Sequence, residues 1–83
     1  MEEKTLKESL AGIPDGHCLI LSSPIIEMMM SGVCDARIRK DGLIKLVYED
    51  GMIETGNASK EILEKTADEQ ALFSWVECVQ SQR

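Results

Sequence analysis

Residues 33–55 read VCDARIRKDGLIKLVYEDGMIET, and two Asp-Gly pairs divide this stretch into three runs. The pairs are Asp41-Gly42 and Asp50-Gly51. An Asp-Gly pair between runs of alternating apolar and polar residues is a strong short-range signal of a β-hairpin. The stretch therefore predicts two hairpins in series, which form a three-stranded antiparallel meander from Val33 to Thr55.

The register of the first hairpin follows from comparing two loop lengths. A two-residue loop would set Ile38 opposite Lys45 and mix polar with apolar residues on both faces. A three-residue loop over 40–42, with Gly42 left-handed, gives one apolar face. We predict the longer loop. The apolar face then holds Cys34, Ala36, Ile38, Ile44, Leu46 and Tyr48, and the other face holds Asp35, Arg37, Arg39, Leu43, Lys45 and Val47. In the second hairpin, either register buries one of Met52 and Ile53.

Upstream of the meander, the sequence predicts helix, turn, strand and helix. Thr5 and Glu8 have the spacing of a capping box at the start of a helix, which Gly12 would end in a left-handed conformation. The Ile-Pro-Asp-Gly segment at 13–16 is a turn, and the apolar run after it indicates a strand from His17 to Ser22, buried on both faces. A short helix then begins at Ser23-Pro24.

Downstream of the meander, we expect helix from Asn57 to the end of the chain. Asn57 or Ser59 can cap a first segment, and Thr66-Ala67-Asp68-Glu69 has the spacing of a second capping box. The stripe expected to dock this helix on the apolar face of the meander consists of Leu72, Trp75, Val76 and Val79, set across Ile38, Ile44, Leu46 and Tyr48.

These elements predict a single α+β domain over residues 1–83. Its antiparallel sheet would have three to four strands, the meander plus the strand His17–Ser22, packed by the C-terminal helix and the short helices. Exposed sheet edges and a half-apolar outer face also favour a homodimer.

Charge and composition indicate where the protein acts. Fifteen acidic and nine basic residues give a net charge of −6, which opposes binding to phosphate backbones. The longest apolar run, Cys18 to Leu21, is far too short to span a membrane, and the charged start does not resemble a secretory signal. Three cysteines are an odd number without close pairing, so we expect them reduced in a cytoplasmic protein.

No motif in the chain carries catalytic chemistry. His17, Cys18, Cys34 and Cys78 are the residue types of a thiol nucleophile or a zinc site, but they lack the spacing that presets either one. Phosphate loops, dinucleotide fingerprints and nucleophile elbows are absent from the sequence. We therefore expect no enzyme activity, no catalytic residues, no metal and no cofactor.

Three surfaces are candidates for contact with a partner. The first is acidic and comprises Glu61, Glu64 and Asp68, and the second is a basic hairpin comprising Arg37, Arg39, Lys40 and Lys45. The third is the run Met28-Met29-Met30, because methionine adapts to irregular surfaces. Charged residues of this kind ordinarily form a solvated face. Methionines ordinarily fill space in a small irregular core.

The function that we expect is protein binding. By size and composition the chain resembles bacterial and phage inhibitors, antitoxins and immunity proteins, which act on a larger protein, plausibly one that handles nucleic acid. The acidic residues, or Arg37, Arg39 and Lys45, would form the interface. The alternative is a nucleic-acid-binding regulator that uses the basic hairpin, although the sheet face there lacks aromatic stacking residues.

Overall fold

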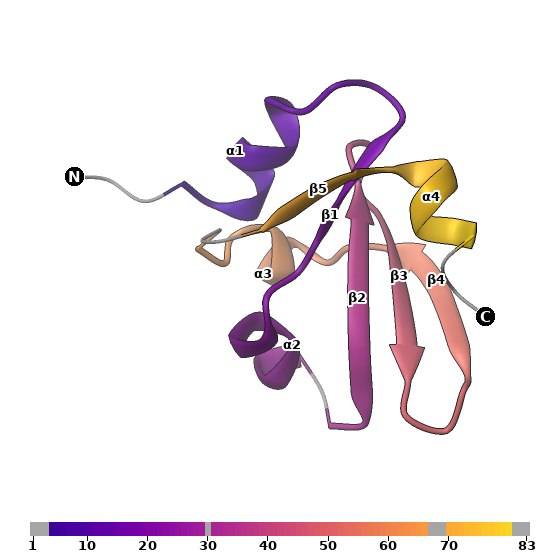
Figure 1. Ribbon diagram of the computed structural model, residues 1–83. Coiled ribbons are helices and arrows are strands. Elements are labelled where there is room, and N and C mark those ends of the chain that lie inside the picture. The colour runs from indigo at the N-terminus through magenta and orange to yellow at the C-terminus, as the bar shows by residue number, and fades with distance from the viewer. Residues whose placement is uncertain (1–3, 30, 67–69, 81–83) are drawn as a thin grey trace.

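The computed structural model describes residues 4–29, 31–66 and 70–80 and has an α+β fold (Figure 1). Five strands form one antiparallel sheet in the order β4-β3-β2-β1-β5. The elements are α1 (Leu6–Ala11), β1 (His17–Ile20), α2 (Ser23–Met29), β2 (Val33–Arg39), β3 (Leu43–Tyr48), β4 (Ile53–Asn57), α3 (Lys60–Leu63), β5 (Ala71–Ser74) and α4 (Trp75–Gln80). The predicted fold class is confirmed, and the sheet has one strand more than the upper number expected.

The register predicted for the first hairpin is confirmed. Ile38 pairs with Ile44 and Ala36 pairs with Leu46, so the loop between β2 and β3 has three residues. Gly42 has a φ of 95° and its N–H donates to the carbonyl of Arg39 at 2.8 Å. A side chain other than glycine is strained at such a positive φ, which is why the Asp-Gly pair is informative here.

Two details of the meander differ from the prediction. The register shifts by one residue between Val33 and Asp35, so Val33 is buried opposite Tyr48 and Cys34 is exposed. A bulge of this kind moves one residue out of the alternation. In the second hairpin neither Met52 nor Ile53 is buried.

The N-terminal helix begins and ends where the sequence predicted. The Thr5 hydroxyl accepts the Glu8 N–H at 3.2 Å, and the Glu8 carboxylate accepts the Thr5 N–H at 3.0 Å, which completes the capping box. Gly12 is the C-cap of the helix, as predicted, but its φ of −95° shows that it is not left-handed. Leu6 and Leu10 point from this helix into the core.

The prediction of helix from Asn57 onward is confirmed only for α3 and α4. The Ser59 hydroxyl caps α3 by accepting the Ile62 N–H at 3.2 Å, but the other described segments are not helical. β4 continues to Asn57, α3 has only four residues, and β5 pairs with β1 over its whole length. The second predicted capping box lies partly outside the described residues, and its Thr66 forms a β-bridge with Thr5.

The predicted docking stripe is also wrong. Leu72 and Val76 are 51% and 62% exposed, and Trp75 stacks on Arg39 rather than on the apolar face of the meander. The side chain of Val79 is outside the described part of the structure.

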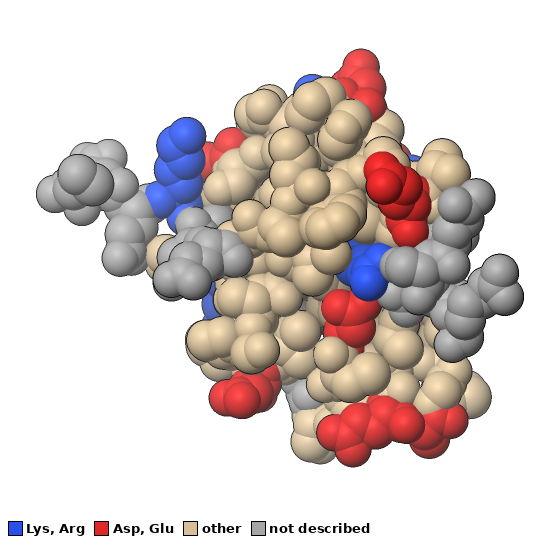
Figure 2. All heavy atoms as spheres, in the orientation of Figure 1, with Lys and Arg blue, Asp and Glu red and all other residues tan. Residues whose placement is uncertain are grey.

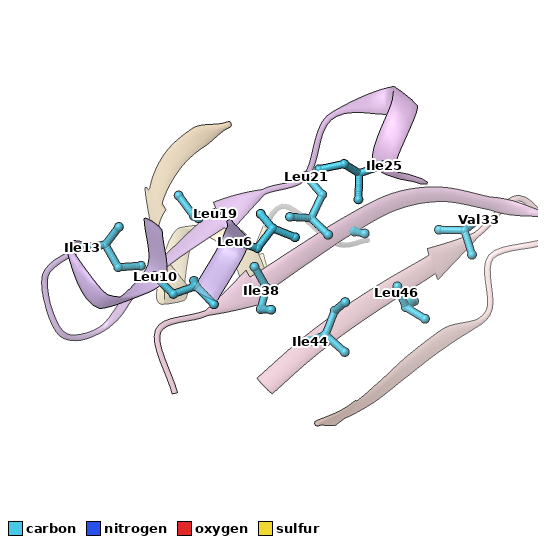
Figure 3. Close-up of a cluster of buried hydrophobic side chains, with 11 residues drawn as sticks. Leu6, Leu10, Ile13, Leu19, Leu21, Ile25, Val33, Ile38, Ile44 and Leu46 are labelled. Atoms are coloured by element: carbon cyan, nitrogen blue, oxygen red, sulfur yellow. The ribbon is translucent and has the colours of Figure 1, made fainter. Parts of the chain in front are cut away.

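The core lies on one face of the sheet, beneath α1 and α2. Figure 3 shows side chains of these helices meeting those of β1, β2 and β3. The core cluster comprises Leu6, Leu10, Ile13, Leu19, Leu21, Ile25, Val33, Ala36, Ile38, Ile44 and Leu46. Its burial supplies the main driving force for folding.

The other face of the sheet carries α4, which stands apart from α1, α2 and α3 in Figure 1. Cys78 of α4 forms a disulfide bond with Cys18 of β1. The expectation that these two cysteines are reduced is therefore wrong. Cys34 is the free cysteine. The pair was missed because the two residues are 60 positions apart and meet only through the β1–β5 pairing that precedes α4.

Within the described residues, no helix is long and apolar enough to cross a membrane.

Candidate functional site

A groove of about 480 Å³ lies beside the edge strand β4, on the core face of the sheet. Its walls come from α2, β3, β4 and the region of α3, through Met28, Ile44, Leu46, Glu54, Thr55, Gly56, Asn57, Ser59, Glu61, Ile62 and Lys65.

The floor of the groove is apolar. Ile44 and Leu46 of β3 are core residues that also line the groove, and Ile62 of α3 packs partly buried against the same core. Met28 of α2 adds a flexible apolar side chain that is 61% exposed. An exposed methionine next to buried aliphatic side chains makes a surface that can adapt to an incoming apolar group.

Gly56 keeps the groove open on the β4 side. It pairs with Ile44, so a side chain at this position would point into the groove with Ile44. A Cβ added to Gly56 would meet nothing within 4 Å. Glycine is not required here by backbone conformation, because its φ is not in the positive range. Its effect is to leave space.

The rim of the groove carries two carboxylates and one ammonium group, from Glu54, Glu61 and Lys65. The Tyr48 hydroxyl donates to the Glu54 carboxylate at 2.7 Å. This hydrogen bond raises the pKa of Tyr48, with burial contributing less. With two carboxylates and one ammonium group, the rim is net negative. Figure 2 shows other acidic side chains at the lower edge of the molecule, near the turn between β3 and β4.

β4 is an edge of the sheet, so no strand among the described residues pairs with its outer side. Tyr48 pairs through its N–H with the Met52 carbonyl, and Ala58 through its N–H with the Gly42 carbonyl. Antiparallel hydrogen bonds alternate along a strand, so Glu54 and Gly56 face β3. The N–H and C=O groups of Ile53, Thr55 and Asn57 consequently point away from the sheet.

The structure separates the acidic residues that the sequence singled out. Glu61 lines the groove, whereas Glu64 is exposed at the end of α3 and does not line it. Asp68 lies outside the described residues. Glu54 and Gly56 were missed. The signal that could have found them is the segment Ile-Glu-Thr-Gly-Asn at 53–57, which has no apolar alternation to bury either face.

The basic hairpin is largely engaged within the protein. Arg37 donates to Asp35 and to the Cys78 carbonyl of α4, each at 2.8 Å, and its side chain is 14% exposed. Lys45 is 6% exposed, and burial lowers its pKa. Lys40 pairs with Asp15 at 3.2 Å.

Arg39, the fourth basic residue of the hairpin, is also engaged in contacts within the protein. It makes a two-point contact with Asp41, with nitrogen to oxygen distances of 2.9 and 2.6 Å, and its guanidinium lies 5.1 Å from the Trp75 ring. The hydrogen bond from Arg39 lowers the pKa of Asp41. These contacts attach α4 and the β2–β3 turn to the sheet.

The residues considered for catalysis are not assembled into a site. The Nδ1 atom of His17 lies 3.3 Å from the Asp15 carbonyl, Cys18 is bonded to Cys78, and Cys34 is exposed. In the described ranges, histidine, cysteine, aspartate and glutamate side chains form no group of three that could hold a metal ion.

Comparison of the chain with protein-family models, curated proteins and solved structures gives no match.

Proposed function

We propose that the chain is a small non-enzymatic protein-binding module whose interface is the groove beside β4. The observation that carries this proposal is the apolar floor of Ile44, Leu46 and Met28 under a rim that holds Glu54 and Glu61. Such a site fits an apolar side chain of a partner that is flanked by lysine or arginine. Pockets that recognise partners commonly combine an apolar interior with a few placed charges.

The net charge of −6 indicates the kind of partner. An acidic surface attracts proteins with basic grooves, and proteins that handle nucleic acid have such grooves. The proposal therefore keeps the class suggested by the sequence, an inhibitor, antitoxin, immunity or phage-type accessory protein that acts on a larger protein.

The nucleic-acid alternative has less support. Arg37 and Lys45 are too buried to reach a phosphate backbone, and Arg39 is paired with Asp41. An oligonucleotide titration at low salt tests it directly. A salt-dependent affinity that falls in the double variant Arg37→Ala plus Arg39→Ala would favour this alternative over protein binding.

The test of the protein-binding proposal is affinity capture from nuclease-treated lysate of the native host. Wild type is compared with the double variant Glu54→Lys plus Glu61→Lys. The control is Glu27→Lys plus Glu49→Lys, which makes the same charge change at exposed positions outside the groove. We expect one stoichiometric protein with wild type and the control, and its loss with the groove variant. Equal capture by all three proteins would contradict the proposal.

The proposal also includes a cytoplasmic location and a homodimer. A cytoplasmic location would expose the Cys18–Cys78 bond to reducing conditions, in which protein disulfides are rare. Thiol trapping on the protein in intact cells tests the location: three reactive thiols after unfolding indicate a reducing compartment, and one indicates an oxidising compartment. The homodimer also stays a prediction, and light scattering of the purified protein tests it.

A further inference from the structure

We infer that the groove receives an extended basic segment of the partner, which adds to the sheet as a new strand beside β4. This inference rests on the proposed function and specifies how the partner binds. In β-strand addition, backbone hydrogen bonds to a free sheet edge provide affinity, and pockets for alternate side chains provide specificity. The β4 edge and the groove beside it offer both features.

The outward backbone groups of β4 are available to a new strand. Ile53, Thr55 and Asn57 direct their N–H and C=O groups away from β3, as the alternation of the β3–β4 hydrogen bonds requires. All five residues of β4 are exposed, so no described segment covers this edge. A row of such groups is a template for another strand.

The groove lies on the side of the sheet to which side chains of an added strand would point. Glu54 and Gly56 face the groove, on the same side of the sheet as Leu46 and Ile44. In a strand added beside β4, every second side chain would point to this side. The side chain next to Gly56 would find open space above Ile44, because Gly56 contributes no side chain.

Charge selects the chemistry of the segment. Glu54 and Glu61 outnumber Lys65 on the rim, so lysine or arginine is favoured two residues from the apolar position, where its side chain points to the same side of the sheet. A helix in the groove would leave the outward backbone groups of β4 unpaired. The observations therefore favour an extended segment over a helical one.

The experiment uses a display library of random twelve-residue peptides, selected on the wild-type protein. The comparison protein is the variant Gly56→Val, which fills the groove. Valine is favoured in strands, and a Cβ at this position meets nothing within 4 Å, so we expect the variant to fold. Thermal unfolding of the variant confirms this independently. We expect enriched peptides to carry lysine or arginine two residues from an apolar residue, so that both side chains point to the groove side of the sheet. We expect them to bind the variant at least about tenfold more weakly.

Backbone methylation of the enriched peptide distinguishes the modes of binding. N-methylation at a residue that donates to β4 removes a backbone hydrogen bond, and we expect about tenfold weaker binding for each such position. Methylation at the alternate residues, whose N–H groups face away from β4, is the matched control and leaves affinity unchanged. Affinity is measured by calorimetry.

The outcomes separate this inference from the proposed function. Enriched peptides with apolar residues three and four apart, or with affinity that no methylation changes, would overturn strand addition and leave protein binding standing. A selection that enriches nothing on wild type over Gly56→Val would also overturn it, while the capture experiment still decides whether the protein binds a partner. Loss of the captured partner in Glu54→Lys plus Glu61→Lys, together with methylation-sensitive peptides, supports both.

Discussion

The strands β2 and β4 belong to the same sheet, but their surroundings differ. β2 lies at the centre of the sheet, with Ala36 and Ile38 fully buried under the helices and Arg37 held by α4 on the other face. β4 lies at an edge, and all five of its residues are exposed. The difference teaches that stability is concentrated around β1 and β2, whereas the accessible backbone and the groove are at β4.

The largest effect that we expect comes from shortening a side chain of β2. Ile38→Ala removes fully buried methyl groups from the core and lowers the free energy of unfolding by about 4 kcal/mol. The same change at the exposed Ile53 of β4 costs less than about 1 kcal/mol. Urea unfolding of both variants measures the contrast. Equal costs would contradict the division between the two strands.

Breaking the disulfide bond should have the next largest effect. Cys78→Ser removes a link that closes a loop of 60 residues, and we expect a loss of about 2–4 kcal/mol in the free energy of unfolding. A reducing agent should destabilise wild type by a similar amount and leave Cys78→Ser unchanged. If the reductant affects both proteins equally, the bond does not stabilise the fold.

A smaller effect is expected from the contact that fixes α4 to β2. Arg37→Ala removes charge-assisted hydrogen bonds to Asp35 and to the Cys78 carbonyl, at a cost of about 1–2 kcal/mol. Arg37→Lys keeps the charge but cannot donate to Asp35 and to the Cys78 carbonyl from two fixed nitrogens. It should therefore recover only part of the lost unfolding free energy. Thermal unfolding distinguishes the two variants. Full recovery by lysine would show that charge alone matters.

The smallest effect concerns Tyr48, the single tyrosine of the chain, beside β4. Its hydrogen bond to Glu54 raises its pKa, so Glu54→Gln should lower the pKa toward the ordinary tyrosine value. The folded protein keeps Tyr48 protonated to higher pH than the unfolded chain does. The stability from this bond is therefore present below the ordinary pKa and is lost as pH rises through the raised one. Absorbance of tyrosinate measures the titration, and an unchanged curve in Glu54→Gln would contradict the assignment.

The sequence predicted the parts of the fold that local residues determine. The β2–β3 hairpin follows from Asp41-Gly42 and the alternation around it, and α1 begins where Thr5 and Glu8 form a capping box. Both signals act over a few residues, so they could be read without knowing any distant contact.

The parts that failed depend on distant contacts. The segment Ala-Leu-Phe-Ser at 71–74 has apolar residues that suit a helix or a strand, and its pairing with β1 makes it β5. The groove escaped prediction for the same reason. Glu61 joins Glu54 and Gly56 in one groove only through the folded arrangement of α3 and β4. The sequence had singled out Met28 and Glu61 as surface residues, but not as parts of the same site.

Hydrogen exchange of the β4 amides tests the central claim most directly. In the free protein we expect the amides of Ile53, Thr55 and Asn57 to exchange quickly and those of Glu54 and Gly56, which face β3, to exchange more slowly. Adding the captured partner should slow the three fast amides and remove this alternation. Protection that appears instead around Arg37 and Arg39, with the β4 alternation unchanged, would contradict a partner-binding groove at β4.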